Sequence, residues 1–162
     1  MIVIADTSPL NYLVLIQQAN LLPRLFGQVL IPPAVWDELN DPDTPAPVRA
    51  WLAQRPSWLQ VQPLRSPPDL QLDDLDAGER EAIALAEQLH ADEILIDELS
   101  ARKEAARRKL SFIGTLGILR RAAQLDLIDL PSALASLQQT TFYVSADLIQ
   151  SLLEEEAQRR KR

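Results

Sequence analysis

Four acidic residues occupy positions from which a folded chain could bring their carboxylates together. Asp6 and Asp97 each directly follow an apolar run without polar alternation, which is typical of a strand covered on both faces in a parallel sheet. Glu38 lies beside the apolar stripe of one predicted helix, and Glu79 lies in the first turn of another. In open α/β sheets, ligands bind at the carboxyl ends of the strands. These four acids are therefore the candidate site.

Carboxylates gathered in this way repel one another unless a cation lies between them. Two unit charges about 4 Å apart cost roughly 4 kcal/mol at an effective dielectric constant of about 20. The chain has no cysteine and a single histidine, His90, which follows an apolar helical run and is assigned to a helix C-terminus. Ligation by oxygen alone indicates Mg²⁺ or Mn²⁺, and carboxylate-held ions of this kind typically serve phosphoryl chemistry.

Asp6 and Glu79 each have a simpler interpretation as helix caps. Asp6, Thr7 or Ser8 could cap the helix that begins near Pro9, and only the arrival of other carboxylates at the same edge would decide against this. Asp76 precedes Glu79 by three residues, which is the spacing of a capping box.

The helix wheel favours Glu79 as a metal ligand. At a step of about 100° per residue, Glu79 falls about 60° from the centre of the apolar face and Glu81 about 100°. Glu79 also follows the small Gly78, which permits close packing. If Glu79 acts only as a cap, the third ligand would be Asp76 or Glu81.

Strands and helices alternate along the chain, which predicts a three-layer α/β fold around a parallel sheet. Strands are predicted over residues 2–5, 28–31, 59–62, 93–96 and 111–113. Helices are predicted from Pro9, over 21–26, from Pro33, around 48–52, over 75–89, 98–109, 115–123 and 131–139, and after a Ser145 cap. A proline-rich connector spans 41–68, where Trp51 and Trp58 are expected to dock on the core.

Composition narrows the class of protein. The 162 residues fit one domain spanning 1–162, and the net charge of −7 argues against a general nucleic-acid coat, so any such binding must be local. The longest apolar run, Tyr12–Ile16, is too short to span a bilayer. No basic region precedes the N-terminal apolar residues, so we expect no signal peptide, no membrane association and a cytoplasmic protein.

The order of five short motifs resembles a PIN-domain protein, most closely the prokaryotic subgroup akin to VapC toxins. The motifs are Asp6-Thr7-Ser8-Pro9-Leu10, Pro32–Glu38, Gly78–Ile83, Leu95–Glu98 with Ala101-Arg102, and Gly114–Gly117. The resemblance implies a five-stranded parallel sheet, RNA phosphodiester cleavage, and Asp6, Glu38, Glu79 and Asp97 as catalytic, metal-binding acids. Ser8, Glu98 and Thr115 would be accessory residues. The glutamate in the third acidic position departs from the aspartate that is common there in VapC proteins.

We therefore expect an Mg²⁺- or Mn²⁺-dependent endoribonuclease that acts as the toxin of a toxin–antitoxin pair. RNA would be held by Arg102, Arg107 and Arg108, whose simpler interpretation is a solvated helix face. The C-terminal helices, about 131–160, are expected to pack on the domain or to form a dimer or partner surface. Their apolar faces, and the resembled family, predict a homodimer that can bind a cognate antitoxin.

Two other readings of the sequence make different predictions. The first is a PIN-fold module that binds RNA or protein with a degenerate metal site, and a magnesium titration would distinguish it from the enzyme. The second is a phosphoacceptor receiver-like domain, which would need a lysine after a late strand, and no lysine directly follows Ile113.

Overall fold

A computed structural model describes residues 1–162 and contains one five-stranded sheet. All strand pairs are parallel, in the order β3-β2-β1-β4-β5. The strands are short: β1 (Val3–Ala5), β2 (Val29–Ile31), β3 (Leu59–Val61), β4 (Glu93–Leu95) and β5 (Phe112–Ile113). The predicted α/β fold with a central parallel sheet is confirmed, and β1 lies at the centre of the sheet.

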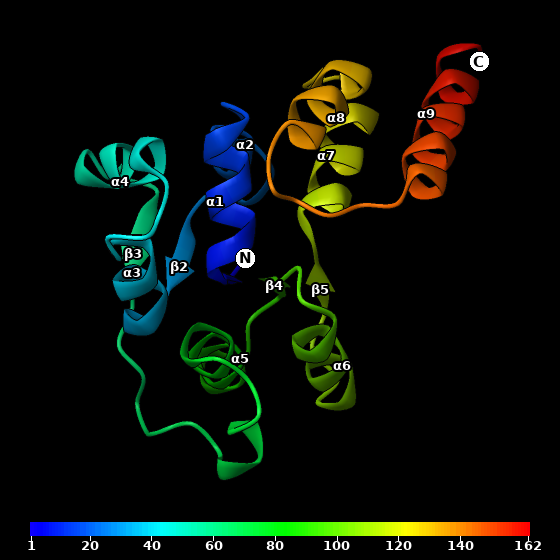
Figure 1. Ribbon diagram of the computed structural model, residues 1–162. Helices are drawn as coiled ribbons and strands as arrows, with labels where there is room; N and C mark the ends of the chain where they lie inside the picture. The colour runs from blue at the N-terminus through cyan, green and yellow to red at the C-terminus, as the bar shows by residue number, and fades with distance from the viewer.

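Helices cover both faces of this sheet (Figure 1). The upper layer in that view contains α1 (Thr7–Leu15), α2 (Leu21–Phe26) and α7 (Thr115–Gln124), and the lower layer contains α5 (Ala77–Leu89) and α6 (Leu99–Arg107). Strand side chains alternate between two cores: Val3 and Ala5 pack with the upper helices, and Ile4 packs with α5 and α6. Both cores bury strand residues, which explains the absence of polar alternation in the sequence.

The chain between β2 and α5 places α3 (Pro33–Leu39) beside the site. Helix α3 packs on α5 and α1 and buries Val35 and Leu39, while Asp37 is exposed, as the apolar stripe predicts. Helix α4 (Ala46–Ala53) and the short 3-10 turn η1 (Leu70–Leu72) complete this stretch. The rings of Trp51 and Trp58 lie 5.8 Å apart and pack against the core, which confirms their predicted docking role.

The last two helices close the upper side of the molecule. Helices α8 (Leu130–Gln138) and α9 (Ala146–Arg160) pack on α7 and on each other, and they bury Leu134, Leu137, Ile149 and Leu152 in the larger core. The hydroxyl of Ser145 accepts a hydrogen bond from the Leu148 backbone N–H, so the predicted cap of the last helix is present. No helix is both long and apolar enough to cross a bilayer.

Predicted and observed element ends differ by a few residues. Helix α5 begins at Ala77 rather than Leu75 because Asp76 caps it, and its C-cap is His90 in a left-handed conformation. Helix α6 ends at Arg107 rather than Lys109, whose own φ is positive at 61°. The turn η1 was not predicted, since its three residues are too short for a periodic signal.

Candidate metal centre

The central strand delivers Asp6 to the carboxyl edge of the sheet. The backbone N–H of Asp6 donates to the carbonyl of Leu95 in β4, at 2.9 Å, so the chain stays tied to the sheet until α1 begins. Asp6 occupies the N-cap position of α1 with an extended backbone, but its side chain makes no capping hydrogen bond. The simpler interpretation of Asp6 as a helix cap is therefore not supported.

Asp6 faces a hollow of about 260 Å³ with acidic walls. One carboxylate oxygen from each of Asp6, Glu38 and Asp76 lies within 4.8 Å of the other two. The remaining lining residues are Thr7, Ser8, Asn11, Tyr12, Glu79 and Glu98. Five of the nine side chains that line this hollow are acidic, and none is basic. The hollow has the donor set and the negative charge that a hard cation requires.

Glu38 is held in the hollow by two donors. The backbone N–H of Gly78 donates to Glu38 Oε1 at 2.9 Å, and the Thr7 hydroxyl donates to Oε2. These bonds depend on the close packing of α3 against α5. A Cβ atom at position 78 would lie 2.8 Å from Glu38 Cδ and would overlap its carboxylate, so only glycine fits here without displacing Glu38.

Asp76 and Glu79 form the capping box that their spacing predicts. The Glu79 N–H donates to Asp76 Oδ1 at 2.8 Å, and the Asp76 N–H donates to Glu79 Oε1 at 3.1 Å. This exchange uses one oxygen of Glu79. The other, Oε2, is buried and has no hydrogen-bond partner. Glu79 therefore caps α5 and also offers a free oxygen, so the two interpretations of this residue are compatible.

Two buried carboxylate oxygens at the acidic hollow have no hydrogen-bond partner. These oxygens are Asp6 Oδ1 and Glu79 Oε2, and the side chains of Asp6 and Glu79 are only 5% and 4% exposed. Burial raises the pKa of Asp6 well above its usual range, and nearby Asp76, Glu79 and Glu38 raise it further. Burial likewise raises the pKa of Glu79 to about 7. A divalent ion fits these residues because it would supply the interaction that both oxygens lack.

The raised pKa of Glu79 predicts a pH-dependent loss of stability in metal-free protein. Between its ordinary value of 4.5 and about 7, folded Glu79 keeps the proton that the unfolded chain releases, so folding stability falls as pH rises through this window. Glu79→Gln preserves the cap and removes the ionisable group. In EDTA, the melting temperature of the wild type should therefore fall relative to that of Glu79→Gln between pH 4.5 and 7.

Thermal melts at half-unit pH intervals test this expectation. Glu154→Gln, at an exposed position of α9, is the matched control and should melt in parallel with the wild type. Parallel curves for the wild type and Glu79→Gln across the whole window would contradict the buried, uncompensated carboxylate described above.

Asp97 lies beside this hollow rather than in it. Its carboxylate accepts hydrogen bonds from the Ser8 hydroxyl at 2.7 Å and from the Thr115 backbone N–H and hydroxyl at 2.6 and 2.7 Å. Asp97 lines two adjoining hollows. The exposed Glu98 lines one of these two hollows and the acidic hollow as well. Ser8 thus connects Asp97 to the acidic hollow, and the fully buried Thr115 holds Asp97 from the other side.

The three arginines predicted to hold RNA have different environments. Arg107 pairs with Glu104 at 2.6 Å, and Arg108 pairs with Glu104 and Glu87, both at 2.7 Å. Nearby acids therefore offset both charges. Arg102 forms no ion pair, and it lines a hollow together with Asp97. Of the three, the structure leaves only Arg102 beside the candidate site with an uncompensated charge.

Asp76 belongs to the acidic group, although its spacing from Glu79 predicts mainly a helix cap. Asp6, Glu38 and Glu79 line the same hollow as Asp76, and Asp97 lines an adjoining one. Glu81, the other alternative, instead accepts a hydrogen bond from the Ala34 N–H at 2.9 Å. The available signal was the cap position itself, because an N-cap side chain lies at the same helix end as a first-turn acid.

Comparison with known proteins supports the assignment of the fold. A search of curated proteins and a search of solved structures found no match. A family model described as PIN domain matches residues 2–158, which spans the whole sheet and all the acids of the candidate site. With the five-stranded parallel sheet and the acidic hollow at its carboxyl edge, this match shows that the chain belongs to the PIN-domain family.

Proposed function

We propose that this protein is a divalent-metal-dependent endoribonuclease. PIN domains are generally metal-dependent nucleases, and the acidic group of this chain offers ligands for such an ion. The observation that carries the proposal is the pair of buried, unpartnered oxygens, Asp6 Oδ1 and Glu79 Oε2, at the acidic hollow. The choice of RNA as substrate, and of Mg²⁺ or Mn²⁺ as the ion, rests on the motif resemblance and on the all-oxygen donor set.

In this proposal Asp6, Glu38 and Asp76 hold the ion, and Glu79 contributes its free Oε2. When bound, the ion would neutralise charge on the scissile phosphate and activate a water molecule. Thr7 and Gly78 orient the Glu38 carboxylate through the two hydrogen bonds described above. The Asp97 carboxylate already accepts three hydrogen bonds, so we assign it to positioning Ser8 at the wall of the hollow.

Cleavage of end-labelled RNA with and without metal tests the activity. We expect cleavage in Mg²⁺ or Mn²⁺ and none in EDTA, with internal cuts that identify an endonuclease. Activity that persists in EDTA would overturn the proposal. Metal binding by calorimetry without any cleavage would instead identify a PIN-fold binding module, which is the alternative from sequence analysis.

We further propose that the chain is the toxin of a VapC-like pair, works as a homodimer and is blocked by a protein antitoxin. Support comes from the order of the five motifs, which resembles that of the VapC-like subgroup. Expression of the wild-type chain alone in bacteria should then slow growth, whereas expression of Asp6→Asn should not. Equal growth of the two strains, at equal protein levels, would contradict the toxin role.

A further inference from the structure

A groove leads away from the acidic hollow toward the C-terminal helices. A second hollow, of about 370 Å³, shares Ser8, Tyr12 and Glu98 with the acidic one. A third, of about 490 Å³, shares Asp97, Phe142 and Tyr143 with the second. Because each hollow shares side chains with the next, the three lie side by side in a row. We call the third hollow and its rim the side groove.

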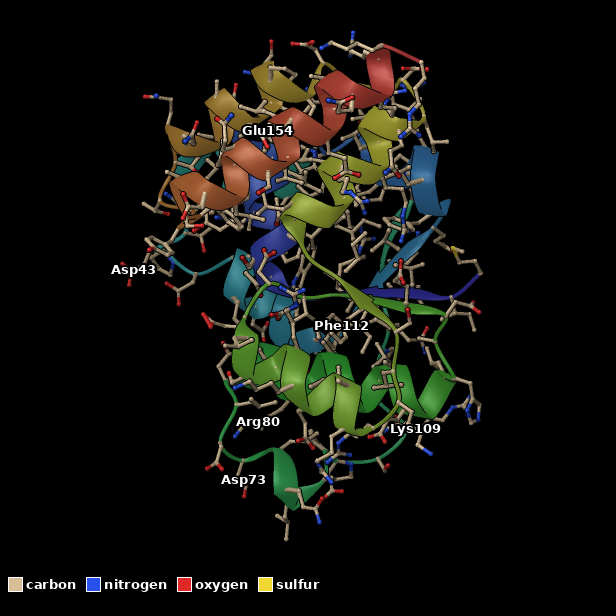
Figure 2. The ribbon with its side chains drawn as sticks, turned by 90° about the vertical axis from the view of Figure 1, so that its right-hand side faces the viewer. Asp43, Asp73, Arg80, Lys109, Phe112 and Glu154 are labelled. Carbon is tan, nitrogen blue, oxygen red and sulfur yellow. The ribbon has the colours of Figure 1, made fainter.

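The side groove has an apolar wall and few polar groups. Its apolar lining comes mainly from Phe112, Ile113, Leu116, Phe142, Val144 and Leu148. Phe112 lies on β5, between α6 and α7 in the view of Figure 2. Asp97 and Arg102 are its charged members. A hollow of this size, with both apolar and polar lining, can accept a small ligand.

The rim of the side groove presents an aromatic ring on a fixed segment. Tyr143 lies in the α8–α9 linker and is 89% exposed. Its neighbours are tied to α1, since the Phe142 ring meets the Tyr12 ring edge-on at 5.0 Å and the Thr141 hydroxyl lies 2.9 Å from the Tyr12 hydroxyl. The segment before Tyr143 is therefore anchored to α1, and the Tyr143 ring is exposed at the rim of the groove.

Arg102 supplies a positive charge to an otherwise acidic region. Its guanidinium lies 5.1 Å from the centroid of the Phe112 ring, and its buried Nε has no hydrogen-bond partner. Arg107, the last residue of the same helix, and Arg108, its C-cap, are both ion-paired. Arg102 thus has a free donor for an anion in a region where the neighbouring carboxylates would otherwise repel a phosphate.

We propose that the side groove binds one nucleotide of single-stranded RNA next to the scissile phosphate. The base stacks on Tyr143 against the apolar wall, and Arg102 contacts the phosphate that flanks it. A base within a duplex cannot reach such a ring, so single-stranded RNA is the substrate form that fits. This inference rests on the proposed ribonuclease function and adds a subsite for the substrate.

A fluorescent base reports the stacking directly. The probe is a uridine octamer with one 2-aminopurine, placed in turn at each position and titrated in Ca²⁺, with the RNA checked for integrity afterwards. Stacking on tyrosine should quench the 2-aminopurine emission at one or two positions. Tyr143→Ala should abolish that quenching and weaken binding about tenfold to a hundredfold. Tyr143→Trp should restore both.

Arg102 has a matched control on its own helix. Arg102→Gln should weaken binding about tenfold, whereas Lys103→Gln, which removes the same charge from an exposed neighbour, should change it less than twofold. Unchanged affinity and quenching in Tyr143→Ala would overturn the inference and indicate another occupant, such as a protein segment. Cleavage in Mg²⁺ would then still support the ribonuclease, and absence of both binding and cleavage would overturn both proposals.

Discussion

Asp6→Asn is expected to abolish metal-dependent cleavage while leaving the metal-free fold as stable as the wild type or more so. Asp6 is 5% exposed, and its Oδ1 has no hydrogen-bond partner. Asparagine keeps the size of the side chain and removes the charge that a hard cation requires. Loss of a residue that only supports a ligand typically costs about ten- to a hundredfold in metal affinity. Loss of a ligand itself should cost at least about a hundredfold in affinity and in activity.

The expected change in the stability of metal-free Asp6→Asn is opposite in direction to that of an ordinary substitution of a buried polar residue. Burial and the nearby carboxylates raise the pKa of Asp6, so the metal-free fold at neutral pH must either bury an unfavourable charge or take up a proton. Removing that charge should raise the melting temperature in EDTA. An ordinary polar-core substitution would lower it.

Calorimetric titration with Mg²⁺ and Mn²⁺, cleavage assays and thermal melts in EDTA measure the three effects. Asp37→Asn is the matched control, because it removes the same charge from an exposed position one residue before Glu38. We expect this control to bind metal and cleave RNA as the wild type does. Wild-type metal affinity and cleavage in Asp6→Asn would remove Asp6 from the site.

Gly78→Ala is expected to fold and to lose metal affinity by at least about tenfold. The added methyl group would meet the Glu38 carboxylate, which is the mobile end of a side chain, so Glu38 moves and the backbone stays. Alanine also has the higher helix propensity, by about 1 kcal/mol, which helps to keep α5 intact. Displaced Glu38 loses its bonds to Gly78 and Thr7, and with them its position in the hollow.

A double-mutant cycle separates this mechanism from a general disturbance of α5. If Gly78→Ala acts through Glu38, it should have no further effect on Mg²⁺ affinity in a Glu38→Ala background. Calorimetry on the wild type, the two single variants and the double variant supplies the four affinities. Independent, additive losses would show that the methyl group acts by another route, and an unchanged affinity in Gly78→Ala alone would remove Glu38 from the ligand set.

The sequence by itself determined the class of fold and the donor atoms that this site can offer. Apolar runs without alternation predicted a sheet buried on both faces, and all five predicted strands are present. The absence of cysteine and the single histidine limited the ligands to oxygens. Helix periodicity also predicted that Glu79 faces the protein interior and that Asp37 points away from it, and in the structure Glu79 is buried and Asp37 is exposed. These properties are local, so short stretches of sequence encode them.

The tertiary structure alone decided which acids share one hollow, because that depends on strand register and helix packing. The register pairs Ala5 with Leu95, so Asp97 lies one residue farther along its chain than Asp6 does. Asp97 therefore meets Ser8 and Thr115 beside the acidic hollow. The packing of α3 on α5 brings Asp76 into contact range of Asp6 and Glu38. Arg107 and Arg108 likewise pair with acids, some of them distant in sequence, so that Arg102 is the one of the three predicted RNA-binding arginines without an ion pair. Distances between side chains on different elements follow from how those elements pack, and no local pattern records them.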